Sequence, residues 1–143
     1  MRFHRRVIYL GPMGGTGAVR VMLVEDHAAF RQALAFLLSG EPDLEVVAEA
    51  GSLTEARQAL RGGALEGDLD VAVVDVGLPD GDGRDLIGEL RLRDADVSVL
   101  ILSATVEGAG LEEATRAGAD AVLEKVEAPQ AIAHEIRRLA AGG

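Results

Sequence analysis

The chain has 143 residues, a length typical of one domain at roughly 150 residues per domain, and long enough to bury a substantial core. Its 24 acidic and 14 basic residues give a net charge of −10, which argues against direct nucleic-acid binding because phosphate backbones are bound by surplus Lys and Arg. Cysteine is absent, which excludes disulfides and thiolate chemistry, and no apolar run approaches the roughly 20 residues that span a bilayer. We expect a soluble, cytoplasmic protein without membrane association.

The first residues differ in charge from the rest. Residues 1–20 hold four arginines and no acid, so the remaining chain carries −14. We interpret residues 1–18 as a flexible, basic, glycine-rich leader and residues 19–141 as the single folded domain. Residues 11–17 resemble a phosphate-binding loop but lack its Gly-Lys-Ser/Thr ending, so no lysine could reach a phosphate.

From residue 19 onward, short apolar runs alternate with amphipathic segments. The runs at residues 19–25, 44–50, 70–76, 97–102 and 120–124 predict five strands. Helical spacing predicts a helix after each strand: one that Gly40 ends, one opened by a capping box of Ser52 and Glu55, one around residues 86–90, one over about 107–117, and a last one that starts near Pro129. This alternation predicts an α/β fold with a parallel sheet and helices on both of its faces.

Polar side chains follow four of the five predicted strands. The first strand ends in Glu25 and Asp26, the third in Asp75, the fourth in Ser103, and the fifth at Lys125, the only lysine in the chain. Because the carboxyl ends of parallel strands meet at one edge of a sheet, we expect these side chains to converge there.

Three carboxylates at one edge repel each other by about 4 kcal/mol per pair at a distance of about 4 Å, so they must bind protons or a cation. Oxygen ligands without cysteine suit Mg²⁺, which recruits phosphate groups, and a lysine and a hydroxyl suit phosphoryl oxygens. A carboxylate can also accept a phosphoryl group. Asp75 is the best candidate, because the Gly/Pro-rich loop behind it is expected to leave it accessible.

Four segments carry a family resemblance: residues 21–27, 73–83, 100–104 and 118–125. In this order and spacing they resemble the landmarks of response-regulator receiver domains of two-component signalling, and residues 43–50 with the last helix resemble receivers of LuxR-type regulators. The resemblance covers about residues 19–141. It implies a flavodoxin-like, doubly wound sheet with the strand order 2-1-3-4-5.

The resemblance also implies a site. Asp75 would accept a phosphoryl group from a phosphohistidine of a sensor histidine kinase. Asp26, Asp75 and the backbone carbonyl of Gly77 would ligate Mg²⁺, with Glu25 supporting the metal through water.

For the switch, the resemblance implies that Ser103 and Lys125 bind phosphoryl oxygens and that movement of Ser103 reshapes the surface around the fourth helix and the fifth strand. Such a domain is a signalling phosphoprotein rather than an enzyme, and residues 107–141 would offer a surface for a homodimer or a partner. Gly77 and Thr105 are small, and we hypothesise that they leave room for a water that removes the phosphoryl group.

Three departures keep alternatives open. Val122 replaces a common aromatic residue, Val126 replaces a proline after the lysine, and Glu25 stands where Asp is commoner. One alternative is a degenerate receiver that binds partners without phosphate. Another is an aspartate-nucleophile phosphatase of the haloacid-dehalogenase type, which is disfavoured because Gly77 stands where a second acid is needed. Residues 80–83 resemble a calcium loop but fit a helix-capping turn better, and His27 fits a solvated or capping residue better than a ligand.

Overall fold

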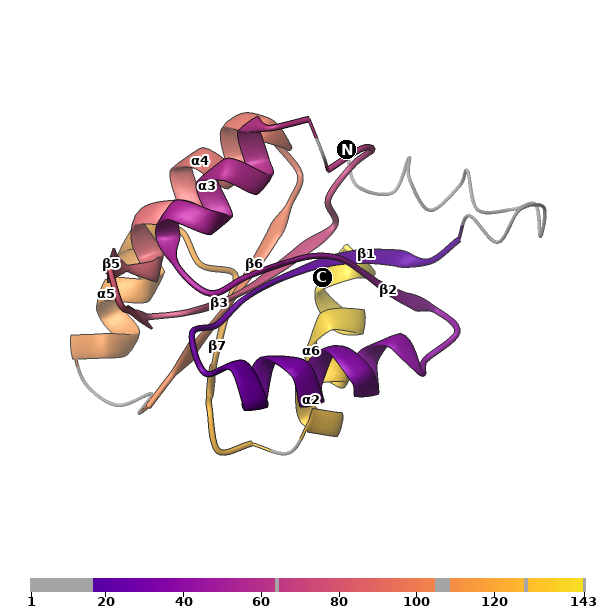
Figure 1. The fold of residues 1–143 in the computed structure, drawn as a ribbon. Coiled ribbons are helices and arrows are strands. Elements are labelled where there is room, and N and C mark those ends of the chain that lie inside the picture. The colour runs from indigo at the N-terminus through magenta and orange to yellow at the C-terminus, as the bar shows by residue number, and fades with distance from the viewer. Residues whose placement is uncertain (1–16, 64, 105–108, 128, 143) are drawn as a thin grey trace.

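A five-stranded parallel sheet forms the centre of the protein in the computed structural model, which describes residues 17–63, 65–104, 109–127 and 129–142 (Figure 1). The strand order is β2-β1-β3-β6-β7. The strands are β1 (Val19–Val24), β2 (Leu44–Ala50), β3 (Val71–Asp75), β6 (Ser98–Ser103) and β7 (Ala121–Glu124). Short strands β4 (Gly77–Leu78) and β5 (Gly81–Asp82) form a separate antiparallel ribbon. Counting the five strands of the main sheet in chain order gives 2-1-3-4-5, so the predicted doubly wound α/β fold is confirmed.

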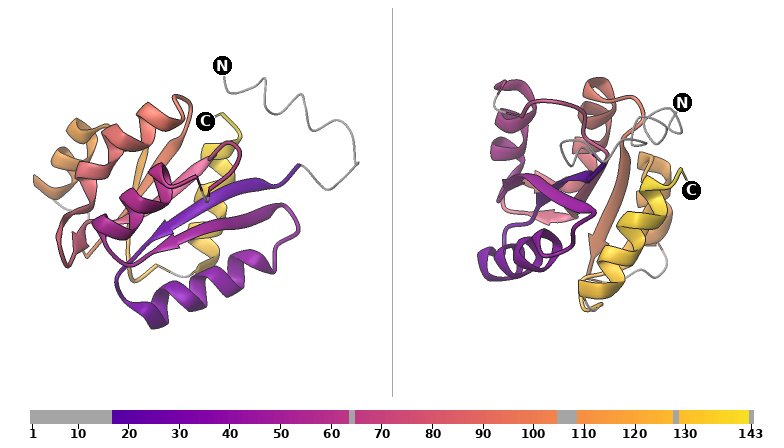
Figure 2. Two further views of the ribbon diagram at one scale, coloured as in Figure 1. Left: turned by 45° about the horizontal axis from the view of Figure 1, so that its top comes forward. Right: turned by 90° about the vertical axis from the view of Figure 1, so that its right-hand side faces the viewer.

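Helices cover both faces of this sheet (Figure 2). One face packs against α2 (Ala28–Ser39) and α6 (Pro129–Ala140), and the other against α3 (Leu53–Arg61), α4 (Ile87–Arg93) and α5 (Ala109–Ala117). Side chains along each strand alternate between the two cores; in β1, Val21 and Leu23 face α2 and α6, whereas Met22 and Val24 face the other helices. Burial on both faces explains why the strands read as continuous apolar runs.

The predicted elements agree with the structure to within one or two residues at the strand ends. The predicted start of the fourth helix at residue 107 lies outside the described residues, as do residues 1–16 of the predicted leader and most of the glycine-rich segment. No helix in the described ranges combines the length and the apolar character that crossing a membrane requires.

The start of α3 follows the predicted capping box only in part. The Ser52 hydroxyl oxygen accepts a hydrogen bond from the Glu55 N–H at 3.1 Å, as expected. The Glu55 carboxylate, however, accepts from the N–H of Gly51 at 2.7 Å instead of from Ser52. The side chain therefore satisfies the backbone one residue earlier than the motif predicts.

The loop after Asp75 returns tightly past the end of β3. Gly83 donates its N–H to the carbonyl of Val76 at 2.8 Å, and a Cβ on Gly83 would lie 2.0 Å from the carbonyl oxygen of Asp75. Only glycine fits this approach. A 3₁₀ turn over Gly83–Leu86 then leads into α4, and the Asp82 carboxylate caps it by accepting from the Arg84 N–H at 2.8 Å. The helix-capping interpretation of residues 80–83 is thus confirmed.

Asp80 in the same loop caps a different helix. Its carboxylate accepts hydrogen bonds from the N–H groups of Leu53 and Thr54, at 2.8 and 2.9 Å, and from the Thr54 hydroxyl at 2.8 Å. These bonds tie the loop behind Asp75 to the start of α3, and they lower the pKa of Asp80 to about 2.

We expect Asp80→Ala to lower the melting temperature at pH 7 by roughly a few degrees, because α3 loses a cap. A carboxylate whose pKa falls on folding stabilises the fold above its unfolded pKa of 3.8, and this contribution is lost as the pH falls through about 2. A ¹³C NMR titration of the Asp80 carboxyl should therefore show a midpoint near 2. Asp68→Ala, at an exposed acid, is the control; an Asp80 midpoint near 3.8 would contradict the cap.

Candidate functional site

Strands β3, β6 and β7 are neighbours in the sheet and end at the same edge of it (Figure 1). Polar residues stand at or directly after the ends of these strands. Asp75 ends β3 and pairs with Leu102, the residue before Ser103. Ser103 ends β6 and pairs with Glu124, the residue before Lys125. The register of the parallel strands thus places the acid, the hydroxyl and the ammonium group in adjacent rows.

The Lys125 ammonium lies among the acids. Its Nζ is 3.0 Å from Oε1 of Glu25, 3.1 Å from Oδ2 of Asp75 and 3.2 Å from Nδ1 of His27. The ring of Phe30 lies beneath it, with its centroid 5.6 Å from Nζ. The fold of the sheet therefore brings together Glu25, Asp75 and Lys125, which lie at least 50 residues apart in the sequence.

 

Asp75 and Glu25 are buried, and Lys125 follows them in the sequence by 50 and 100 residues. Asp75 is buried, with 6% of its side chain exposed, and Glu25 is buried as deeply, at 3%. The expectation that the following loop leaves Asp75 accessible is therefore wrong. The loop folds back along the end of β3, and the lysine ammonium packs against the carboxylate.

Asp26 and His27 complete the group of side chains. One ligand atom from each of Glu25, Asp26, His27 and Asp75 lies within 4.8 Å of the others. His27 is largely exposed, as expected of a solvated histidine, yet its Nδ1 lies 3.1 Å from Oε2 of Glu25 and 3.6 Å from Oδ1 of Asp26. Its position directly after the acidic pair is the only signal in the sequence for this contact.

Backbone groups connect the remaining predicted residues to Asp75 and Lys125. The Gly77 N–H donates to Oδ1 of Asp75 at 3.2 Å, and the Lys125 N–H donates to the carbonyl of Ser103 at 2.9 Å. A Cβ on Gly77 would meet no atom within 4 Å, so a larger side chain has open space at this position. Thr105, the other position of the water hypothesis, lies outside the described residues.

Burial and repulsion set the electrostatics of the site. Burial, followed by the nearby charge of Glu25, raises the pKa of Asp75, while Lys125 and the Gly77 N–H oppose this shift. For Lys125, burial lowers the pKa, but the hydrogen bonds and charges of Glu25 and Asp75 together outweigh it and raise the pKa. The ammonium group is thus held in its charged form by the acids around it.

The donor set fits a hard divalent cation. Oε1 of Glu25 is buried and has no hydrogen-bond partner within the described chain, although the Lys125 ammonium lies 3.0 Å away. Carboxylate oxygens are ligands that Mg²⁺ prefers. The acidic group could therefore hold such an ion.

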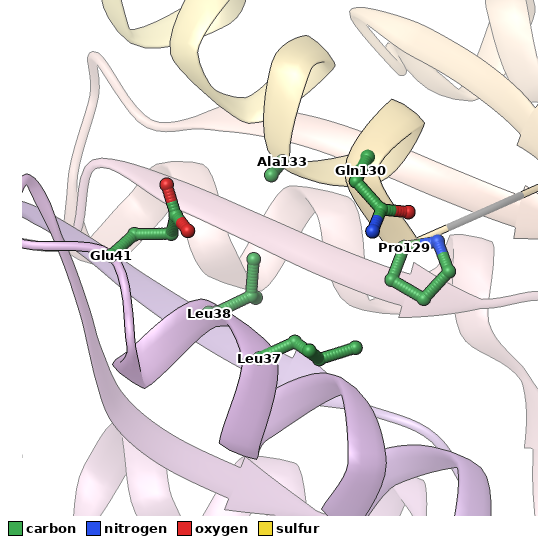
Figure 3. Close-up of a pocket in the computed structure, with 6 residues that line it drawn as sticks. All are labelled: Leu37, Leu38, Glu41, Pro129, Gln130 and Ala133. Carbon is green, nitrogen blue, oxygen red and sulfur yellow. The ribbon is translucent and has the colours of Figure 1, made fainter.

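A pocket elsewhere on the protein is a weaker candidate. It lies between α2 and α6 and has a volume of about 60 Å³, which is too small for an organic ligand (Figure 3). Its walls are formed mainly by apolar side chains; the lining residues are Leu37, Leu38, Glu41, Pro129, Gln130 and Ala133.

Comparison with known proteins decides the family. The sequence profile of the response regulator receiver domain matches residues 21–137, which is most of the chain. The chain belongs to the response regulator receiver family. This receiver domain of a two-component response regulator has the strand order and the acidic edge that its sequence predicts.

The relatives of this receiver are longer proteins. It is 37% identical over 124 residues to the DNA-binding transcriptional activator DevR/DosR of Mycobacterium tuberculosis, an alignment that covers 87% of this chain and 55% of that protein. It is 34% identical over 125 residues to the transcriptional regulatory protein UhpA of Salmonella typhimurium, which covers 87% of this chain and 60% of that protein. The receiver thus spans little more than half the length of these curated relatives.

Solved structures show the same fold. A LuxR family two-component response regulator from Aurantimonas sp. superposes with a TM-score of 0.75 at 30% identity, covering 87% of this chain and 86% of that chain. The resemblance to receivers of LuxR-type regulators is confirmed.

We expect Asp75→Asn to raise the melting temperature of the metal-free receiver by roughly a few degrees. Because folding raises the pKa of Asp75, the free energy of unfolding falls as the pH rises from 3.8 through the folded pKa, and it stays lower above that range. Removing the charge removes this cost at pH 7, and calorimetry at pH 7 without divalent ions measures it. Asp80→Asn is the control and should shift the midpoint the other way; a lower midpoint for Asp75→Asn would contradict the cost of burying this charge.

Proposed function

We propose that this receiver accepts a phosphoryl group on Asp75 from a phosphohistidine of a sensor histidine kinase, in a reaction that depends on Mg²⁺. The observation that carries the proposal is the Asp75 carboxylate 3.1 Å from the lone lysine ammonium, inside a group of acids at the carboxyl edge of the sheet. The carboxylates of Asp26 and Asp75 and the carbonyl of Gly77 would hold the ion, and Glu25 would support it through water.

In the proposed transfer, an oxygen of the ionised Asp75 carboxylate forms the new O–P bond. The N–P bond of the phosphohistidine breaks, and its electron pair returns to the imidazole nitrogen. Bound Mg²⁺ would supply positive charge for the phosphoryl oxygens. Lys125 and the hydroxyl of Ser103 are the residues of the chain that we assign to the same oxygens, since charged and hydroxyl donors stabilise a transferred phosphoryl group.

The switch is proposed to act on residues 107–141, which include α5, β7 and α6. Ser103 and Lys125 are connected by a backbone hydrogen bond across β6 and β7, so a phosphoryl group that draws both side chains would pull on this side of the sheet. We infer that this region contacts a second copy or an output domain in the cytoplasm. The match to the DNA-binding activator DevR/DosR supports an output in transcription.

Phosphorylation of Asp75 can be tested with acetyl phosphate and Mg²⁺. We expect the intact mass of the protein to increase by one phosphoryl group, and Asp75→Asn and chelation of Mg²⁺ each to abolish the increase. Asp85→Asn, at an exposed acid in the 3₁₀ turn before α4, is the matched control and should be phosphorylated normally. A wild-type protein that gains no phosphoryl group would favour the degenerate receiver, and catalytic turnover of a phosphate ester would favour the phosphatase.

The lifetime of the phosphoryl group tests the role of Gly77. The open space at this position leaves room for an attacking water, so we propose that the receiver dephosphorylates itself. A leucine at Gly77 is expected to slow the loss of phosphate about tenfold, which corresponds to about 1.4 kcal/mol of barrier. Gly88→Leu, on α4, is the control. If the phosphoryl group had the same lifetime in Gly77→Leu as in the wild type, water access at Gly77 would not limit the rate of dephosphorylation.

A further inference from the structure

Lys125 occupies the place among the acids that a cation would take. Its Nζ contacts both oxygens of Glu25, at 3.0 and 3.1 Å, and Oδ2 of Asp75, at 3.1 Å. Its side chain is only 21% exposed, so this is a held ammonium group rather than one that points into solvent. The ammonium and a divalent ion would therefore draw on the same carboxylates.

Glu25 makes two of the three carboxylate contacts to the Lys125 ammonium, and the position of Glu25 is itself fixed by hydrogen bonds. Its Oε2 accepts a hydrogen bond from the His27 N–H at 2.8 Å, and its backbone carbonyl accepts one from the Arg31 guanidinium at 2.6 Å. Its backbone N–H donates to the carbonyl of Ala50 at 2.9 Å. The carboxylate is therefore presented to Lys125 from a rigid position.

We propose that Glu25 is a positioning residue that holds the Lys125 ammonium over Asp75 in the metal-free receiver, so that Mg²⁺ binds in competition with this ion pair. The inference rests on the proposed function of the site. The proposal assigns a role to the length of the Glu25 side chain. Aspartate is one methylene shorter, so its carboxylate could not keep the hydrogen bond from the His27 N–H and still reach Nζ of Lys125 at 3.0 Å. Asp75, buried against Lys125, would become accessible as the ammonium moves.

Competition makes a prediction that a simple metal-ligand role does not. If Glu25 acted only by supporting the metal, shortening it would weaken Mg²⁺ binding. If it holds Lys125, Glu25→Asp keeps the negative charge but loosens the ammonium, and Mg²⁺ should bind roughly three- to tenfold more tightly, the size of a modest coupling between two charged groups. Glu45→Asp, on β2 and exposed, is the matched control and should leave the affinity unchanged.

A double-mutant cycle isolates the ion pair. Lys125→Met removes the ammonium and should itself tighten Mg²⁺ binding, measured by isothermal titration calorimetry. In the Lys125→Met background, Glu25→Asp should no longer tighten it, because no ammonium remains to be released. A gain in affinity from Glu25→Asp of the same size with and without Lys125 would overturn the proposal, as would weaker or unchanged binding in Glu25→Asp alone.

The single lysine provides a second readout that does not depend on phosphorylation. In protein labelled with ¹⁵N-lysine, the side chain gives one ammonium resonance, and it is visible when hydrogen bonds slow its exchange with water. We expect a resonance in the metal-free wild type that disappears or shifts on addition of Mg²⁺, and that is already lost in metal-free Glu25→Asp. A resonance that is the same in both proteins would overturn the proposal.

Failure of this inference and failure of the proposed function give different results. If the wild type binds Mg²⁺ and gains a phosphoryl group on Asp75 but Glu25→Asp changes neither the affinity nor the lysine resonance, only the role of Glu25 is wrong. If the wild type neither binds Mg²⁺ nor gains a phosphoryl group, the proposed function fails, and the inference fails with it.

Discussion

The repulsion among carboxylates at the carboxyl edge of the sheet is the constraint on which the rest of the site depends. Two unit charges about 4 Å apart cost about 4 kcal/mol at an effective dielectric constant near 20, and here Glu25 and Asp75 are also buried. The apolar cores on both faces of the sheet stabilise the parallel pairing of the strands. This pairing places the acidic strand ends next to each other despite their repulsion. A positive charge has to meet the acids, and the Lys125 ammonium supplies one.

This arrangement connects the chemistry of the site to its accessibility. The lysine ammonium that pairs with Asp75 also packs against it, and the carboxylate is buried in this arrangement. Val122, at the position where the family often has an aromatic residue, is a half-buried side chain that packs against the core formed with α3, α4 and α5.

Much of this could be predicted from the sequence because it depends on local patterns. Apolar runs of five to seven residues indicate strands buried on both faces, and the position of Asp75 directly after such a run places it at the edge of the sheet. What could not be predicted depends on contacts between distant segments. The sequence carries no periodic signal that Asp80 caps a helix 26 residues earlier, or that the returning loop and Lys125 bury Asp75. Likewise, the capping-box motif does not specify that the Glu55 carboxylate accepts its hydrogen bond from the N–H of Gly51 rather than from that of Ser52.

The most direct test of the account is a crystal structure of the receiver with Mg²⁺ and beryllofluoride, a stable mimic of a phosphoryl group. The account predicts the beryllium on a carboxylate oxygen of Asp75, the magnesium against Asp26 and the Gly77 carbonyl, and fluorines within hydrogen-bond distance of Ser103 and Lys125. A magnesium ion bound elsewhere, or a Lys125 ammonium still paired with Glu25 while beryllofluoride occupies Asp75, would contradict it.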